Sequence, residues 1–250
     1  MPSLDFNCDL GEGCGQDAAI VPHISSASIA CGAHAGDAST MREAVALCLA
    51  HGVAIGAHPS FEDREHFGRR ELALPVAEIR ALVARQIALL ASACSEAGVR
   101  LHHVKPHGAL YNLAARDRGV AGAIVDAVRD ADPKLILYGL ANSELTAAGE
   151  AAGLRVAHEA FAERAYDADG RLAPRGTPGA VVEGFEDALA QVRRCVRDGI
   201  VIARDGRRVP IRADTLCLHG DRADAADFAR GLRAALAAEG VSIRAPGHAA

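Results

Sequence analysis

The chain alternates short apolar runs with amphipathic helical patterns along almost its whole length, and this alternation limits the folds open to it. The expected strands are the apolar runs at residues 4–9, 28–31, 53–57, 101–105, 135–140, 155–159 and 215–219. The expected helices lie between them, at residues 39–51, 75–97, 116–131, 143–152, 180–197 and 223–239. Repeated strand–helix units give parallel strands joined by right-handed crossovers. The pattern therefore predicts an α/β fold, a seven-stranded (βα) barrel.

The same pattern bears on domain organisation. No change of composition and no Pro/Ser-rich linker divides the 250 residues, so we expect a single (βα)-barrel domain over residues 1–250. One segment interrupts the alternation: residues 199–213 hold two alternating runs on either side of Asp205-Gly206. That arrangement is typical of a β-hairpin. This insertion either borders the site or serves only as a surface feature.

Charge and hydropathy exclude several classes of partner. The formal net charge is -5, which argues against nucleic acid and against an anionic membrane surface. The N-terminal residues lack the pattern of a signal peptide, and no run of about 18 uncharged apolar residues exists. We therefore expect a cytoplasmic protein. Seven cysteines without regular spacing argue against a disulfide framework.

Four histidines stand where an apolar run ends in a glycine- or proline-containing turn. They are His34, His58, His107 and His219. The C-terminal ends of parallel strands gather on one face of an α/β fold, and that face carries the site. Four imidazoles delivered there from four strands are hard to explain as packing. The sequence therefore predicts an active site at this face.

Acidic side chains occupy the same strand ends. Asp9 and Glu12 flank a glycine turn after the first strand, Glu159 ends the sixth, and Asp221 follows the seventh. Carboxylates so placed bind hard cations or divide acid and base roles. For the first pair, a loop aspartate beside a solvated glutamate is the alternative. Asp37 is as well suited to capping the next helix as to joining the site.

Cationic side chains complete the pattern. Lys105 is one of only two lysines among 27 basic residues, yet it falls in the densest polar motif, with Asn112 near by. Arg69 and Arg164 suit an anion such as a carboxylate or a phosphate. The chain contains no Walker loop, no Gly-x-Gly-x-x-Gly after a strand and no Gly-x-Ser-x-Gly. These residues favour hydrolytic or phosphoryl chemistry on a small anionic substrate.

Several of these motifs resemble those of the LamB/YcsF family. They are residues 7–13, 30–37, 56–60 with 68–70, 104–112, 161–164 with 174–175, and 214–221. The most specific of them is Val-Lys-Pro-His-Gly-Ala-Leu-Tyr-Asn at 104–112. The resemblance implies a TIM-barrel variant allied to the glycoside hydrolase/deacetylase superfamily. It also implies an activity shared with two other 5-oxoprolinase subunits, the ATP-dependent opening of 5-oxoproline to glutamate. ATP is then a co-substrate of the complex.

The resemblance carries ten of these residues over as a candidate site: Asp9, Glu12, His34, His58, Lys105, His107, Glu159, Arg164, His219 and Asp221. The roles that follow are hypotheses from the chemistry of the side chains. The catalytic candidates are Asp9, Glu12, Lys105, His107, Glu159 and His219. The candidates for binding substrate or phosphate are His34, His58, Arg69, Asn112, Arg164 and Asp221. A divalent metal stays open, with Asp9, His34, His58 and His219 as candidate ligands. This chain departs from the family pattern at Ser28, Ala33 and Glu163, which are supporting positions.

Two other functions remain open from the sequence. One is a metal-dependent amidohydrolase or deacetylase that acts alone. The other is a non-catalytic subunit that binds 5-oxoproline and passes it to a partner enzyme. Association of the chain with copies of itself is also left open.

Overall fold

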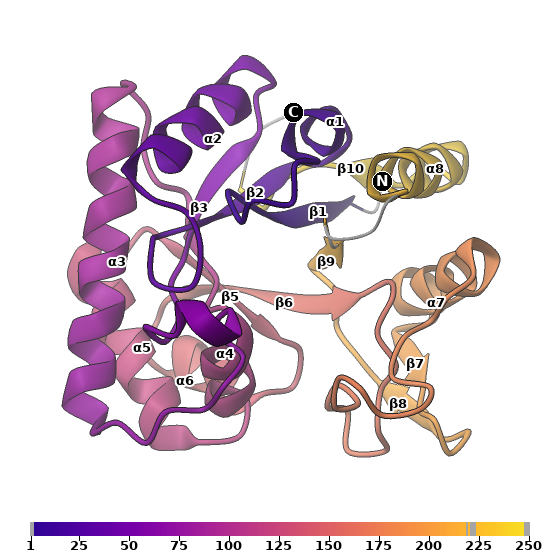
Figure 1. The fold of residues 1–250 in the computed structure, drawn as a ribbon. Coiled ribbons are helices and arrows are strands. Elements are labelled where there is room, and N and C mark those ends of the chain that lie inside the picture. The colour runs from indigo at the N-terminus through magenta and orange to yellow at the C-terminus, as the bar shows by residue number, and fades with distance from the viewer. Residues whose placement is uncertain (1–2, 219, 221–223, 248–250) are drawn as a thin grey trace.

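Seven parallel strands close into a barrel in the computed structural model, which describes residues 3–218, 220 and 224–247 (Figure 1). The strands are β1 (Ser3–Leu10), β2 (Ser26–Ala30), β3 (Ala54–His58), β4 (His103–Val104), β5 (Ile136–Leu140), β6 (Arg155–Phe161) and β9 (Thr215–Leu218). They pair in that order, and β9 also pairs with β1, which closes the ring. The predicted seven-stranded (βα) barrel is confirmed.

β1 is the longest strand, and its pairing explains the closure. Residues 7–10 of β1 pair with β2, residues 5–8 pair with β9, and Ser3 and Leu4 pair with a short added strand, β10 (Ser242–Ile243). β4 is shorter than the predicted run at 101–105. The flanking amides still bond to β3, because His102 N donates to Ile55 O at 2.7 Å and Lys105 N donates to Ala57 O at 2.9 Å.

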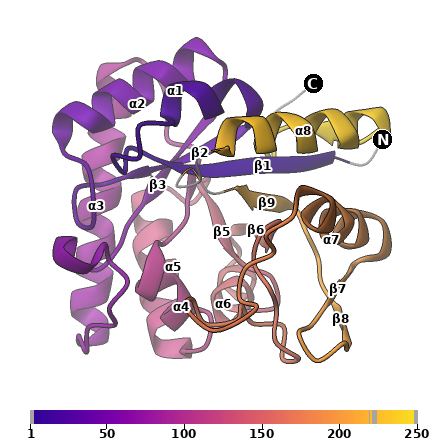
Figure 2. The same ribbon diagram turned by 45° about the vertical axis from the view of Figure 1, so that its right-hand side comes forward.

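Helices cover the outside of the barrel, as Figures 1 and 2 show. The predicted ones are α2 (Ala38–Ala50), α3 (Val76–Glu96), α5 (Arg118–Ala131), α6 (Glu144–Ala151), α7 (Phe185–Asp198) and α8 (Ala225–Ala238). α7 begins at Phe185 and not at residue 180, because residues 181 and 182 run beside Arg164 and Glu163 as extended chain. Two short helices were not expected from the sequence, α1 (Asp17–Ile20) and α4 (Gly108–Ala114).

The open question about Asp37 is settled by its contacts. Its carboxylate accepts hydrogen bonds from Ser39 N at 2.8 Å and Thr40 N at 3.0 Å, and Thr40 Oγ1 bonds back to the Asp37 amide. This is a capping box, which satisfies two of the amides left open at a helix start. Asp37 is thus the cap of α2.

The segment between β6 and β9, residues 162–214, is referred to below as the arm. It carries α7 and the expected hairpin, formed by β7 (Ile200–Ile202) and β8 (Arg208–Pro210) in antiparallel pairing. Figures 1 and 2 show α7 and this hairpin in orange, on one side of the barrel. No helix among the described residues has the length and apolar character needed to span a bilayer. All seven cysteines are free thiols.

Candidate active site

A pocket of about 480 Å³ opens at the C-terminal ends of the barrel strands, between α4 and the arm. Its lining includes nine of the twelve residues expected from the sequence: Asp9, Glu12, His58, Arg69, Lys105, His107, Asn112, Glu159 and Arg164. His34 lies behind these, against His107 and Glu12. His219 and Asp221 lie outside the described residues. The structure therefore gathers the strand-end residues at one site, as parallel barrels do.

Three histidines and one glutamate form a compact cluster at one end of the pocket. The rings of His34 and His107 stack with their centroids 3.8 Å apart, and His58 meets both edge-on. Glu12 Oε1 lies 2.9 Å from His34 Nε2 and 3.4 Å from His107 Nδ1. His58 ends β3, His34 follows β2, and His107 precedes α4, so three separate βα units build the cluster.

Backbone carbonyls fix the protons on two of these rings. His58 Nδ1 lies 2.7 Å from Lys105 O, and His107 Nε2 lies 2.9 Å from Phe67 O. Since a carbonyl oxygen can only accept, each of these nitrogens carries the proton. The remaining nitrogens, His58 Nε2 and His107 Nδ1, face each other at 2.9 Å with Glu12 beside them. Two lone pairs at that distance repel, so the contact calls for a positive charge, either a proton or a metal ion.

Burial shapes the ionisation of the cluster. Burial, together with the nearby His58, lowers the pKa of His34 and of His107 to about 3. Burial also raises the pKa of the Glu12 carboxyl, and Asp9 adds to that shift. For Asp9, burial opposes ionisation, but His58 and Lys105 outweigh it and hold its pKa well below the usual value. At neutral pH the cluster thus combines neutral His34 and His107 rings with an ionised Asp9.

Four side chains offer ligand atoms that all lie within 4.8 Å of one another: Glu12, His34, His58 and His107. Imidazole nitrogens with one carboxylate oxygen suit a borderline cation such as Zn²⁺. Two of the sequence candidates, His34 and His58, belong to this group. Asp9 lies beside it, with Oδ2 3.2 Å from His58 Nε2. Glu12 and His107 also belong to the group, although the sequence placed them among the catalytic candidates and not among the candidate metal ligands.

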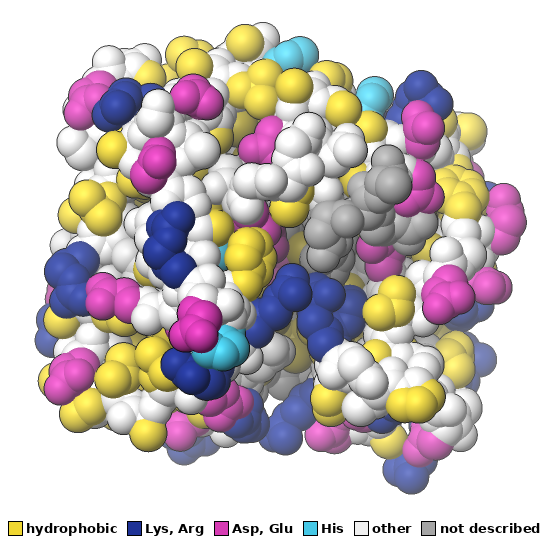
Figure 3. Space-filling model, viewed as in Figure 1, with side chains coloured by type: hydrophobic (Ala, Val, Ile, Leu, Met, Phe, Trp, Pro, Cys, Tyr) yellow, Lys and Arg dark blue, Asp and Glu magenta, His cyan; other side chains and the backbone are white. Residues whose placement is uncertain are grey.

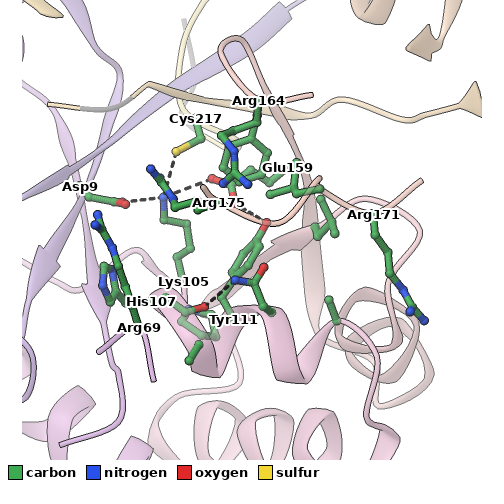
Figure 4. Close-up of a pocket in the computed structure, with 18 of the residues that line it drawn as sticks. Asp9, Arg69, Lys105, His107, Tyr111, Glu159, Arg164, Arg171, Arg175 and Cys217 are labelled. Carbon is green, nitrogen blue, oxygen red and sulfur yellow. Dashed lines mark hydrogen bonds and ion pairs between the residues drawn. The ribbon is translucent and has the colours of Figure 1, made fainter. Parts of the chain in front are cut away.

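Lys105 lies at the centre of a second, buried network (Figure 4). Its Nζ lies 2.6 Å from Asp9 Oδ1, 2.7 Å from Asn7 Oδ1 and 3.2 Å from Glu159 Oε1. Burial alone would lower the pKa of Lys105, but Asp9, Cys217 and Glu159 raise it well above the usual value. An ammonium has three protons to donate. The hydrogen bonds of Nζ go to Asn7 Oδ1, Glu159 Oε1 and Cys217 Sγ, while the contact with Asp9 Oδ1 is an ion pair. Lys105 therefore holds Asp9 by charge.

Two further residues of this network were not among the candidates expected from the sequence. Asn7 Nδ2 donates to Glu159 Oε1 at 2.9 Å and to Thr215 Oγ1 at 2.7 Å. Tyr111 donates its hydroxyl to Glu159 Oε2 at 2.5 Å. Both stand in the strand-end motifs, and the fact that Asn7 is one of three asparagines was the only hint in the sequence. Together they hold the Glu159 carboxylate in one orientation.

Arginines form a cationic wall of the pocket, and Arg69 lies next to the histidine cluster, because the Phe67 ring contacts both Arg69 and His107. Arg69, Arg164, Arg171 and Arg175 all line it. Figure 3 shows basic side chains gathered in the hollow at the centre of that face, and Figure 4 shows these arginines around Lys105 and Glu159. Arg69 lies over the ring of Phe67, 5.1 Å from its centroid. The pocket thus has an acid–imidazole end and a cationic wall, which suits an anionic substrate.

Residues 4–250 match the LamB/YcsF family. The chain belongs to this family. The A subunit of 5-oxoprolinase from Bordetella pertussis is 52% identical over 249 residues, which cover 98% of this chain and 99% of that protein. The crystal structure of the lactam utilization protein from Thermus thermophilus has 47% sequence identity and a TM-score of 0.90, over 97% of this chain and 99% of that one.

A more distant solved structure shares the fold only. The putative cellobiose-phosphate cleavage protein from Enterococcus faecalis V583 has 12% identity and a TM-score of 0.57, over 97% of this chain and 96% of that one. At this identity the likeness shows the fold alone.

Proposed function

We propose that this chain is the A subunit of an ATP-dependent 5-oxoprolinase, which opens 5-oxo-L-proline to L-glutamate. The proposal rests on family membership, on the names of the similar proteins, and on one observation at the site. That observation is the meeting, in one pocket, of an ionised Asp9, a Glu12–histidine cluster and an arginine wall. A carboxylated lactam offers an anion for the wall and a carbonyl carbon for water activated at the other end.

The chemistry needs ATP because a five-membered lactam resists hydrolysis. The lactam oxygen attacks the terminal phosphorus of ATP, and ADP leaves. Water then adds to the carbon that bears the phosphorylated oxygen, and it loses a proton. The carbon–nitrogen bond breaks as the ring nitrogen takes a proton, which leaves an acyl phosphate. A second water hydrolyses the resulting acyl phosphate to glutamate and phosphate. ATP is a co-substrate of the complex.

The residues of this chain supply positioning and proton transfer in these steps. Asp9, held by Lys105 at 2.6 Å, is placed to take the proton from water. Glu12 and His107 lie next to it as further proton carriers. Arg69 stands nearest to this end on the cationic wall and is placed to hold a developing negative charge.

A divalent metal fits the Glu12–histidine cluster. The unpartnered His34 Nδ1 and the facing lone pairs of His58 and His107 are the features of the described residues that argue for it. Bound there, the ion would lower the pKa of a water molecule and polarise a carbonyl. The same fit favours the second candidate function, an amidohydrolase that acts without ATP.

The proposal also includes the expectations from the sequence about domain organisation, cellular location, partner subunits, His219 and Asp221. Residues 1–250 form one domain with a hairpin insertion, and the protein works in the cytoplasm with two other 5-oxoprolinase subunits. His219 would serve with the catalytic group and Asp221 with the binding group, as their motif implies.

Glutamate release from 5-oxoproline tests the proposal. We would measure it with and without ATP, for the purified chain alone and for the chain co-expressed with the two partner subunits. Release that needs both ATP and the partners supports the proposal. Release by the chain alone without ATP, abolished by a chelator, supports the amidohydrolase. Turnover that survives replacement of His58 and His107 would reduce the chain to a binding subunit.

A further inference from the structure

Arg164 is a buried cation with no acidic partner within the described part of the chain. Its side chain is 7% exposed. One terminal nitrogen donates to Ala173 O at 2.6 Å, while its Nε meets no hydrogen-bond acceptor among the described residues. Burying a charge without a partner costs free energy. A protein keeps such a residue where a ligand supplies the missing charge.

The backbone that carries Arg164 is held rigidly. The side-chain amide of Gln191, on α7, donates to Phe161 O at 2.9 Å, Ala162 O at 3.2 Å and Arg164 O at 3.0 Å. The hydroxyl of Tyr166 accepts from Phe161 N at 2.9 Å. With its backbone held in this way and one terminal nitrogen bonded to Ala173 O, the Arg164 side chain needs little ordering when a ligand binds.

The surroundings of Arg164 add further positive charge. Burial, together with Arg175 beside it, lowers the pKa of Arg164 to about 10, so the guanidinium is still charged at neutral pH. Both residues line the pocket that holds Lys105 and Glu159 (Figure 4). The positive charge of Arg175 disfavours the charged form of Arg164, and an anion bound at Arg164 would offset this repulsion.

We propose that Arg164 is the centre of an anion subsite that binds the negatively charged group of the substrate, which is a carboxylate or a phosphoryl group. This inference rests on the proposed function and adds a specificity to it. Arg164 selects lactams that carry an anionic group and rejects the same ring without one. Its planar guanidinium matches two oxygens of such a group at once.

Calorimetric titration tests the specificity on the purified chain. 5-Oxo-L-proline is compared with 2-pyrrolidinone, which is the same lactam without the carboxylate. Arg164→Gln should weaken 5-oxoproline binding roughly 10- to 100-fold, the range expected for lost hydrogen bonds to a charge. 2-Pyrrolidinone should bind weakly and equally to both proteins. Arg207→Gln is the control, because Arg207 lies on the hairpin of the arm, exposed and paired with Asp205 at 2.9 Å.

A thermal melt separates a binding role from a structural one. Because Arg164 lacks an acidic partner among the described residues, Arg164→Gln should leave the Tm of the ligand-free protein unchanged or raise it. Inorganic phosphate, compared with chloride at equal ionic strength, should raise the Tm of the parent protein and not that of Arg164→Gln. A lower Tm combined with undiminished ligand binding would make Arg164 a structural residue and overturn the inference.

The outcomes also separate this inference from the proposed function. If 5-oxoproline binds the parent protein and Arg164→Gln equally well, the subsite is refuted while the function stands. If the parent protein binds no 5-oxoproline, the proposal that this chain binds that substrate is refuted. The thermal melt with inorganic phosphate then tests the subsite. If phosphate raises the Tm of the parent protein but not that of Arg164→Gln, Arg164 is the centre of an anion subsite for a phosphoryl group. If phosphate does not raise the Tm of the parent protein, the anion subsite is refuted.

Discussion

Replacing Lys105 with methionine perturbs both the stability and the chemistry of the site, and the structure sets the size of the effect. The ammonium lies within 3.2 Å of two carboxylates, those of Asp9 and Glu159, and its side chain is only 3% exposed. Removing one partner of a buried ion pair costs about 3–5 kcal/mol, because the other charge stays buried. The free energy of unfolding of a domain is roughly 5–15 kcal/mol. We therefore expect Lys105→Met to fold, but with a large part of that free energy lost.

A double-mutant cycle isolates this charge pairing. Glu159→Gln removes one of the two carboxylates and keeps a side chain that can still bond Asn7 and Tyr111. If Lys105 acts by neutralising Glu159, the double variant should recover about 1–3 kcal/mol relative to the sum of the single changes. Urea unfolding followed by circular dichroism, on the parent protein and the three variants, measures the coupling.

Two results would contradict this reasoning. Purely additive losses would mean that Lys105 and Glu159 do not act on each other in the folded state. Near-normal glutamate production by Lys105→Met in the complete complex would remove Lys105 from the mechanism, whatever its effect on stability. We expect turnover to be abolished, because Asp9 would lose the partner that holds it ionised and in place.

Three further predictions concern metal, packing and the arm. After dialysis against a chelator, the protein should take up about one equivalent of Zn²⁺ or Co²⁺ by elemental analysis, and His107→Ala should take up none; equal uptake would rule out the cluster. Gly56→Ala should abolish soluble folded protein, because the added Cβ would lie 2.2 Å from the ring of His103. Gly122→Ala in α5 is the control: its Cβ meets nothing within 4 Å, and it should raise the free energy of unfolding by about 0.5–1 kcal/mol. Gln191→Leu leaves three buried carbonyl oxygens without a donor and should lower the free energy of unfolding in urea by about 1–3 kcal/mol. It should also weaken 5-oxoproline binding. Binding at parental strength would show that the arm does not position Arg164.

The sequence alone was enough to place the barrel and the face that carries the site. Strand–helix alternation is a local property, because each apolar run and each amphipathic period is readable within ten to twenty residues. Chain direction then puts every strand end on the same face, and so His34, His58 and His107 could be expected together. The hairpin was legible for the same reason, since Asp205-Gly206 marks a tight turn between alternating runs.

Only the tertiary structure decided which of these atoms touch and which charges lack a partner. Lys105 and Glu159 are 54 residues apart, and Asn7 and Glu159 are 152 apart, so closure of the barrel alone brings each pair together. The histidine tautomers depend on where Phe67 O and Lys105 O fall, which no local pattern encodes. The sequence marked Arg164 as a candidate for binding an anion, but only the structure shows that it is buried without an acidic partner among the described residues. The physical reason is that periodicity specifies elements and faces, whereas ionisation and ligand geometry depend on desolvation and on contacts a few ångströms long between distant parts of the chain.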